Sequence, residues 1–263
     1  MSIEGTYSLK KSADVIRAIL HSRDESLAFD VPVDGGSVRF DVLHRPDWRV
    51  FRGIYIEKTY ETQYDGVVVV DIGAHRGIYS AYALQHGCAA LVAYEPKPTN
   101  FALLSENIDR STGSNQQTEA QQKIVTGGES AECYVYDESW SHSTRRRSDK
   151  ALTETIRVGA ISLDDVVERA VVFGGDQSRV IVKIDVEGAE YEIVEGASTE
   201  SLSLIDEMFI ETHDYAVGDT RNMDTIQQNG GLDPVVDYSH NAGQHRLHRY
   251  IRVDAGRMDV AGA

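Results

Sequence analysis

Residues 67–84, VVVVDIGAHRGIYSAYAL, constrain the fold more than any other part of the chain. Four valines followed by an aspartate predict a buried strand, and the run over residues 77–85 predicts a helix. The loop between them contains two glycines. A strand that leads through so short a loop into a helix is typical of a strand–helix–strand unit in a parallel sheet.

The same alternation continues along the chain. The sequence predicts further strands over residues 89–95, 179–186 and 204–211, and helices over 98–108, 163–170 and 189–196. Elements that alternate at this spacing predict an α/β fold with a doubly wound, mostly parallel sheet. Near the end, two strand-like runs within residues 231–254 flank a polar loop with Asn241 and Gly243, which predicts a closing antiparallel hairpin.

The first 60 residues lack this regular alternation. They predict a helix near 12–20 and short strands near 26–31 and 37–43. We therefore expect an N-terminal prelude over residues 1–60 that packs on the ligand cleft, and a main domain over residues 61–263. At their junction lies WRVFRGIYIEKTYE, in which Tyr55, Glu57 and Tyr60 either touch a ligand or form the packed face of an amphipathic segment.

Composition limits the location of the protein and its redox chemistry. No stretch approaches the roughly 18 apolar residues that span a bilayer, and the start has no apolar core followed by a cleavage site. We therefore expect a soluble, cytoplasmic protein without stable membrane insertion. Two cysteines, Cys88 and Cys133, predict buried or inert thiols, because they cannot form a disulfide framework.

Charge restricts the partners. The chain carries 42 acidic and 26 basic residues, a formal net charge of −16. Such an acidic surface is typical of halophilic proteins, in which concentrated salt screens the self-repulsion, although an ordinary acidic enzyme is the alternative. Either interpretation argues against nucleic-acid binding, which depends on clustered Lys and Arg.

The glycine loop lies at the carboxyl edge of the predicted sheet, where open α/β folds bind ligands. Gly73 would let a ligand approach the backbone, and Gly77 would let the helix begin close to the sheet. Asp71 would repel the pyrophosphate of a nicotinamide dinucleotide but suits the cationic end of S-adenosylmethionine. Glu95 ends the next strand, where a carboxylate can accept hydrogen bonds from ribose hydroxyls. The alternative is that Asp71 and Glu95 only cap helices.

Four motifs together resemble the FkbM-type methyltransferases, which are S-adenosylmethionine-dependent. These motifs are VVDIGAHRGIYS, AYEPKPTNFALLSENI, VIVKIDVEGAEYEIVEGA and IDEMFIETH, and they cover residues 66–215. The resemblance implies a Rossmann-like class I methyltransferase fold. The chain departs from the family pattern at His75, where Asn is more usual, and over the polar residues 111–155, which match no motif.

The resemblance also implies which residues hold the cofactor. The methionine end would contact the glycine loop and the first helical turn: Asp71, Gly73, Ala74, His75, Gly77 and Ser80, the last reaching the methionine carboxylate. Glu95 and Pro96 would hold the ribose. The adenine would lie beside IVTGGES, where Gly127 and Gly128 permit close approach.

The motif KIDVEGAE predicts a second chemical centre, with Asp185, Glu187 and Glu190 within six residues. Glu211 and His213 end the next strand at the same edge. Methyl transfer requires alignment of the acceptor and removal of one proton, so we expect catalysis from Asp185, Glu211 and His213. His213 is the candidate general base, unless it only makes backbone hydrogen bonds. A divalent metal bridging these three residues is a further alternative.

The segment SWSHSTRRRSDK concentrates cations in an otherwise acidic chain. Arg145, Arg146 and Arg147, with Trp140 and His142, form either a flap that captures an anionic acceptor such as a uronate, or a solvated loop.

The sequence therefore predicts an O-methyltransferase acting on a hydroxyl or carboxyl group of a small molecule or glycan. A catalytically silent S-adenosylmethionine-binding module and a nicotinamide-dependent oxidoreductase are the alternatives. The acceptor and the oligomeric state are left open by the sequence.

Overall fold

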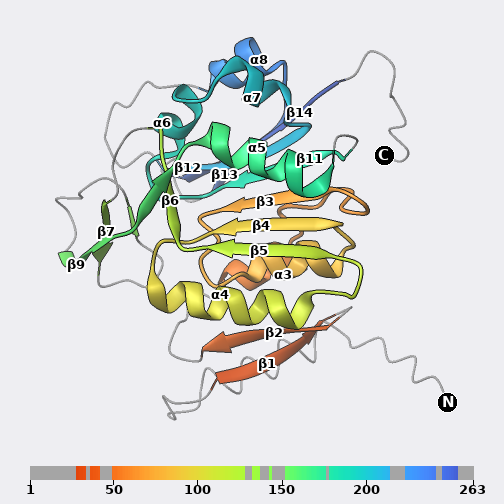
Figure 1. The fold of residues 1–263 in the computed structure, drawn as a ribbon, viewed down its shortest axis with the longest axis vertical. Coiled ribbons are helices and arrows are strands. Elements are labelled where there is room, and N and C mark those ends of the chain that lie inside the picture. The colour runs from red at the N-terminus through yellow and green to blue at the C-terminus, as the bar shows by residue number, and fades with distance from the viewer. Residues whose placement is uncertain are drawn as a thin grey trace.

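The computed structural model in Figure 1 describes most of the chain. Described are residues 28–33, 36–41, 49–127, 132–136, 142–143, 152–175, 178–213, 223–240 and 245–253. Several predictions lie outside these ranges or concern side chains that are not described: the helix near 12–20, Gly128, the Cys133, Trp140 and His142 side chains, Arg145, Arg146, Arg147, and the loop with Asn241 and Gly243.

The largest sheet in the described part of the chain has seven strands in the order β13-β14-β12-β11-β3-β4-β5. Their bounds are β3 (Val68–Ile72), β4 (Ala90–Tyr94), β5 (Gln117–Gln121), β11 (Val180–Ile184), β12 (Glu207–His213), β13 (Asp233–His240) and β14 (His245–Ile251). The strands from β12 to β5 are parallel, and β14 is antiparallel to both of its neighbours. The prediction of a doubly wound, mostly parallel sheet that ends in an antiparallel hairpin is confirmed.

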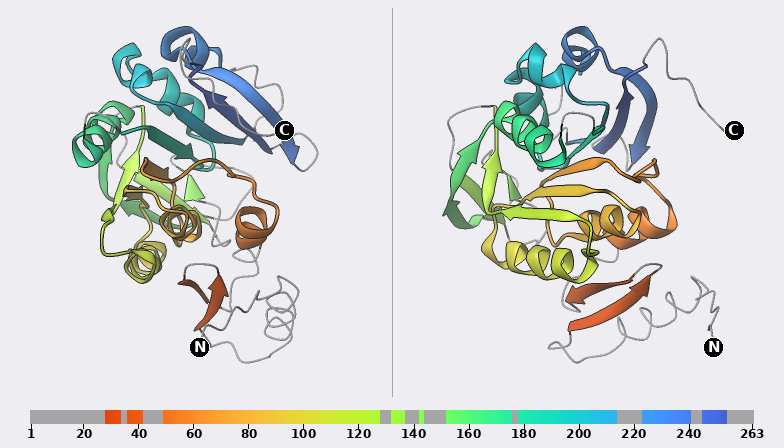
Figure 2. Two further views of the ribbon diagram at one scale, coloured as in Figure 1. Left: turned by 90° about the vertical axis from the view of Figure 1, so that its right-hand side faces the viewer. Right: turned by 45° about the vertical axis from the view of Figure 1, so that its right-hand side comes forward.

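Helices cover both faces of this sheet (Figure 2). On one face lie α5 (Leu163–Gly174), α6 (Glu190–Glu195), α7 (Thr199–Ser203) and α8 (Asp224–Gly230); on the other lie α3 (Ile78–Gln85), α4 (Pro98–Ser111) and the short π-helix η1 (Arg52–Ile56). Side chains of β3 alternate between the two cores, because successive strand residues point to opposite faces. Val68 and Val70 join the α5 side, whereas Val69 joins the α3 side.

Residues 111–155, which the sequence left without structure, contain strands. β5 is the edge strand of the main sheet, and its residues Gln, Thr, Glu, Ala and Gln are all at least partly exposed. An edge strand with both faces partly in water has no need for apolar alternation, so hydrophobic periodicity could not reveal it. Nearby, β6 (Lys123–Val125) pairs with β10 (Gly159–Ile161), and β7 (Glu132–Tyr136) pairs with β8 (His142–Ser143) and β9 (Leu152–Arg157).

The described residues before Tyr64 pack against the rest of the chain. β1 (Ala28–Val33) and β2 (Gly36–Asp41) form an antiparallel hairpin beside α4 (Figure 1). Phe51 and Tyr60 are buried in the core on the α3 side of the sheet. Among the described residues, no helix is both long and apolar enough to cross a membrane.

Candidate functional site

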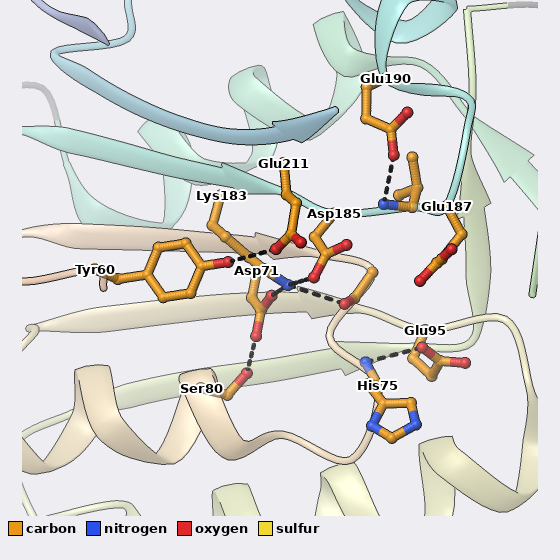
Figure 3. Close-up of polar contacts among 12 residues, drawn as sticks. Tyr60, Asp71, His75, Ser80, Glu95, Lys183, Asp185, Glu187, Glu190 and Glu211 are labelled. Atoms are coloured by element: carbon orange, nitrogen blue, oxygen red, sulfur yellow. Dashed lines mark hydrogen bonds and ion pairs between the residues drawn. The ribbon is translucent and has the colours of Figure 1, made fainter. Parts of the chain in front are cut away.

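The carboxyl ends of β3, β4, β11 and β12 lie at one edge of the sheet because these strands are parallel. This edge brings together the acids that the sequence placed at strand ends (Figure 3). They are Asp71 and Glu95 from β3 and the end of β4, Asp185 after β11, Glu211 in β12, and Glu187 and Glu190 from the loop and helix that follow β11.

Gly73 brings the loop after β3 against the loop after β11. Its φ is +74°, and a Cβ at this position would overlap the carbonyl oxygen of Asp185. The absent side chain therefore accommodates the neighbouring backbone, a reason that the sequence analysis did not anticipate. Gly77 also has a positive φ, +78°, and a Cβ there would lie 2.8 Å from Leu104 in α4. Gly77 thus permits close packing of the two helices rather than of helix on sheet.

Asp71 is fully buried and bonded within the protein. Its Oδ2 accepts a 2.6 Å hydrogen bond from the Ser80 hydroxyl. Its Oδ1 accepts a 3.2 Å hydrogen bond from the ammonium of Lys183. Ser80, which the resemblance assigned to the cofactor carboxylate, therefore faces Asp71 (Figure 3).

Lys183 is the residue that the sequence analysis missed. It lies in β11 directly beside Asp71 of β3, and its ammonium also donates to the carbonyl oxygen of Gly73 at 3.0 Å. Burial alone would lower the pKa of this lysine, but the carboxylates of Asp71 and Asp185 outweigh it and raise the pKa above its usual value. Lys183 is therefore charged at neutral pH. The available signal was a lysine inside the apolar strand VIVKI.

Glu95 follows β4 and is oriented by the backbone. The amide of His75 donates to its Oε2 at 2.9 Å, and the amide of Lys97 donates to its Oε1 at 2.9 Å. The glutamate is only 4% exposed, and burial raises its pKa to about 7, although these amides oppose the shift. A carboxylate can accept about four hydrogen bonds, so this orientation is compatible with a ligand diol.

The remaining predicted cofactor residues lie around this loop. Ala74 is buried, and its amide donates to the Tyr94 carbonyl at 2.9 Å. The carbonyl of Pro96 accepts a 3.2 Å bond from Gln122. A Cβ on Gly127 would overlap the backbone carbonyl of Glu192, so this glycine allows close contact with α6.

His213 lies at the centre of the acidic cluster. Its Nδ1 is 2.7 Å from Oε1 of Glu190, which is fully buried at the start of α6. Its Nε2 faces three further carboxylates, with Glu187 at 3.7 Å, Asp185 at 3.8 Å and Glu211 at 4.0 Å. The structure thus brings together the three predicted catalytic residues and adds Glu187 and Glu190.

The ionisable groups of this cluster shift one another. Burial alone would lower the pKa of His213, but the nearby Glu187 and Glu190 raise it well above its usual value. Burial raises the pKa of Glu187 to about 8. Burial, together with the charge of Asp185, raises the pKa of Glu211 to about 7. Shifts of this size concentrated at one place are typical of functional sites.

The cluster also has the geometry of a cation site. Asp185, Glu187 and His213 each offer one ligand atom, and these atoms lie within 4.8 Å of one another. This set contains Glu187 where the sequence analysis considered Glu211. Glu190 holds the other ring nitrogen of His213, as carboxylates commonly do behind a metal-binding histidine.

Tyr60 connects the N-terminal segment with the site. The Tyr60 hydroxyl lies 3.5 Å from Oε2 of Glu211 (Figure 3). The centre of its ring lies 5.0 Å from that of Tyr79. Tyr55 instead donates to Gln85 in α3 and packs there as an amphipathic residue. Glu57 pairs with Arg52 at the surface.

The chain is similar to known methyltransferases. A family model described as the methyltransferase FkbM domain matches residues 71–231. The chain is 24% identical over 211 residues to Methyltransferase 1 of Beauveria bassiana, covering 72% of this chain and 82% of the relative. It is 28% identical over 187 residues to the hexuronic acid methyltransferase AglP of Haloferax volcanii, covering 69% and 72%. The crystal structure of methyltransferase FkbM from Methylobacillus flagellatus is 14% identical, with a TM-score of 0.49, over 81% of this chain and 52% of that chain.

Proposed function

Because the chain belongs to the FkbM methyltransferase family, we propose that it is an S-adenosylmethionine-dependent O-methyltransferase that modifies a small molecule or glycan. The observation that carries this proposal is that the DIGAHRG loop and Glu95 lie at the same sheet edge as His213 and the carboxylates around it. One half suits a nucleoside with a cationic end, and the other suits acceptor activation. A cytoplasmic location is part of the same proposal.

The residues present fit this cofactor. Glu95 is a buried carboxylate oriented by two backbone amides, which suits the ribose hydroxyls, with Pro96 beside it. The loop from Gly73 through Ala74 and His75 to Gly77 would enclose the methionine end. The adenine would lie near Gly127 and Gly128. When bound, S-adenosylmethionine supplies an electrophilic methyl group on a sulfonium, and the surrounding carboxylates favour that positive charge.

The acceptor would be activated by residues of the His213 cluster. In the transfer, an acceptor oxygen forms a bond to the methyl carbon while the carbon–sulfur bond breaks, its electron pair passing to sulfur. A hydroxyl acceptor must also lose its proton. With Nδ1 of His213 bonded to Glu190, Nε2 is the atom that would take this proton. Asp185 and Glu211 would orient the hydroxyl beside it.

The charge of the cluster favours a hydroxyl acceptor over a carboxylate. Asp185, Glu187 and Glu211 surround Nε2 of His213 within 4.0 Å. Above about pH 8, where Glu187 and Glu211 are ionised, these groups would repel an ionised acceptor, whereas a neutral hydroxyl would not be repelled. One relative is named as a hexuronic acid methyltransferase. A uronate is therefore a candidate acceptor, since such a sugar carries both hydroxyl groups and a carboxyl group. We therefore propose a sugar hydroxyl as the acceptor, and a carboxyl group as the alternative.

An acceptor panel tests the proposal. Methyl transfer from labelled S-adenosylmethionine would be measured with glucuronic acid, with its methyl ester and with glucose as acceptors. Mass spectrometry of the products would detect a gain of about 14 Da, one methylene unit. We expect the methyl ester, in which the carboxyl is blocked, to be methylated at least as well as the free acid. Transfer to the free acid alone would assign the reaction to the carboxyl group.

Cofactor binding distinguishes the proposed methyltransferase from the two alternative functions. We expect calorimetry to detect S-adenosylhomocysteine binding and no NAD binding. Binding without transfer to any acceptor, including those of a cell extract, would indicate a catalytically silent module. Binding of NAD instead would indicate an oxidoreductase.

A divalent cation at Asp185, Glu187 and His213 is the alternative to the base role of His213, because the ion would occupy Nε2; it is supported by the grouping of the three ligand atoms within 4.8 Å of one another. One nitrogen and two carboxylates suit Mn²⁺ or Mg²⁺ in an oxygen-rich shell. Titration with MnCl₂, followed by electron paramagnetic resonance, would detect the ion without any acceptor. A spectrum of free Mn²⁺ alone would exclude the site.

A further inference from the structure

We propose that Lys183 is a positioning residue that joins the cofactor loop to the acceptor cluster, and that Asp71 acts on the cofactor through Lys183 rather than by contact. The inference rests on the proposed function and adds to it a residue that neither the motif analysis nor the family resemblance assigned. It replaces the expectation that Asp71 binds the cationic end of the cofactor directly.

Both carboxylate oxygens of Asp71 already accept hydrogen bonds within the protein. It has no exposed surface, its Oδ2 is bonded to Ser80 at 2.6 Å, and its Oδ1 is bonded to Lys183 at 3.2 Å. Because Asp71 has no exposed surface, a cofactor ammonium could reach this carboxylate only if the side chains that cover it moved. Replacing a buried ion pair in that way would leave the Lys183 ammonium without its strongest counterion.

The ammonium of Lys183 contacts both halves of the site. It donates to the carbonyl of Gly73 at 3.0 Å, in the loop that would hold the methionine end. It also lies 3.6 Å from Oδ2 of Asp185, next to the proposed acceptor position. Figure 3 shows the lysine between Asp71, Asp185 and Glu211.

The strands hold the lysine in place. Lys183 is paired in register with Asp71 across the parallel strands β11 and β3, so both side chains leave the sheet on the same face. The ammonium lies 5.9 Å from the centre of the Tyr79 ring on α3. A long side chain confined in this way can transmit the position of one strand end to the other.

The alternative to a positioning role is that Lys183 only neutralises the buried charge of Asp71. The two roles differ in what happens when both charges are removed. Removal of one member of a buried pair is strongly destabilising, whereas removal of both members is often tolerated. A purely neutralising lysine would therefore be dispensable in the double variant, but a positioning lysine would not.

The test compares Asp71→Asn, Lys183→Met and the double variant Asp71→Asn/Lys183→Met with the wild type. Melting temperature reports stability, and calorimetry with S-adenosylhomocysteine reports cofactor affinity without requiring an acceptor. Lys58→Met is the matched control, because Lys58 is exposed and pairs only locally with Glu61.

We expect Lys183→Met to lower the melting temperature and the double variant to regain most of it. We expect the double variant still to bind S-adenosylhomocysteine about tenfold or more weakly than wild type, a change of about 1.4 kcal/mol. Asp71→Asn should add little to the affinity loss of Lys183→Met, since coupled residues are not additive. Lys58→Met should bind normally.

Two results would overturn the inference. Wild-type affinity in the double variant would reduce Lys183 to a neutralising role. Equal losses from Asp71→Asn with and without Lys183 would show direct contact between Asp71 and the cofactor. If Lys183→Met does not fold, the double variant still decides the first point, and Lys183→Gln, which also removes the charge, replaces the single variant for the second. If the wild-type protein does not bind S-adenosylhomocysteine at all, the proposed function itself is wrong.

Discussion

Glu95 is buried and accepts hydrogen bonds from two backbone amides. Burial raises its pKa to about 7. The ionised carboxylate is the form that accepts the strongest hydrogen bonds from the ribose hydroxyls. Because the pKa is raised, this form becomes scarce as the pH falls below about 7. Cofactor affinity should therefore depend on pH through this single residue.

We expect affinity for S-adenosylhomocysteine to rise roughly tenfold between pH 6 and pH 8, as the ionised fraction of Glu95 grows from about one tenth to nine tenths. Calorimetry across this range measures the slope. Glu95→Gln keeps the shape and removes the titration, so this variant should bind weakly and with a smaller slope. The same slope in Glu95→Gln would assign the pH dependence to Glu187 or Glu211.

His213 requires a different test, because Glu187 and Glu190 raise its pKa well above its usual value against the effect of burial. If it is the base, the methylation rate should increase with pH, and His213→Ala should lower that rate by roughly 10²- to 10⁴-fold with little change in cofactor affinity. Glu190→Gln removes a carboxylate that raises the pKa of His213. In that variant, the rise in rate should move to lower pH.

The acceptor identified from the panel would serve for these rate measurements. An unchanged pH profile in Glu190→Gln, or full turnover in His213→Ala, would pass the base role to Asp185 or Glu211. Asp185→Asn would then be the informative variant, because an amide keeps the shape but takes no proton.

At the scale of elements, the site depends on the contact between the loops that follow β3 and β11. Gly73 and Gly66 form a matched pair for testing this contact. Both have left-handed backbones, with φ of +74° and +72°, but a Cβ on Gly66 would have no neighbour within 4 Å. Only Gly73 abuts the Asp185 backbone.

Gly66→Ala should cost about 1–2 kcal/mol, the penalty of placing a side chain in the left-handed region. Gly73→Ala adds a clash with backbone that cannot move cheaply, so it should be more destabilising and should also weaken cofactor binding. Denaturant unfolding and calorimetry measure the two effects. Equal stabilities in the two variants would mean that the loops separate without cost.

At the scale of the whole molecule, the dominant feature is the net charge of −16 from 42 acids and 26 bases. Self-repulsion of such a surface destabilises the compact state at low salt. The Debye length falls from about 10 Å at 0.1 M salt to about 3 Å at 1 M, so added salt should relieve this strain.

We expect the melting temperature to rise between about 0.1 M and 2 M KCl, where the Debye length falls below about 3 Å. Sucrose is the control, since it stabilises by exclusion from the surface without screening charge. A response to KCl no larger than that to sucrose would indicate an ordinary acidic protein rather than a halophilic one.

The sequence by itself determined the alternation of strands β3, β4, β11 and β12 with helices α3, α4, α5 and α6, and the edge at which Asp71, Glu95, Asp185 and His213 meet, but it missed the edge strand β5. Hydrophobic periodicity is local, and parallel strands necessarily bring their carboxyl ends to one edge. Only the tertiary structure decided that Asp71 pairs with Lys183 from a strand 112 residues away, that Gly73 makes room for backbone, and that Glu190 holds His213. These are contacts between segments distant in the chain, and their geometry depends on how the strands align and pack, which no local pattern encodes.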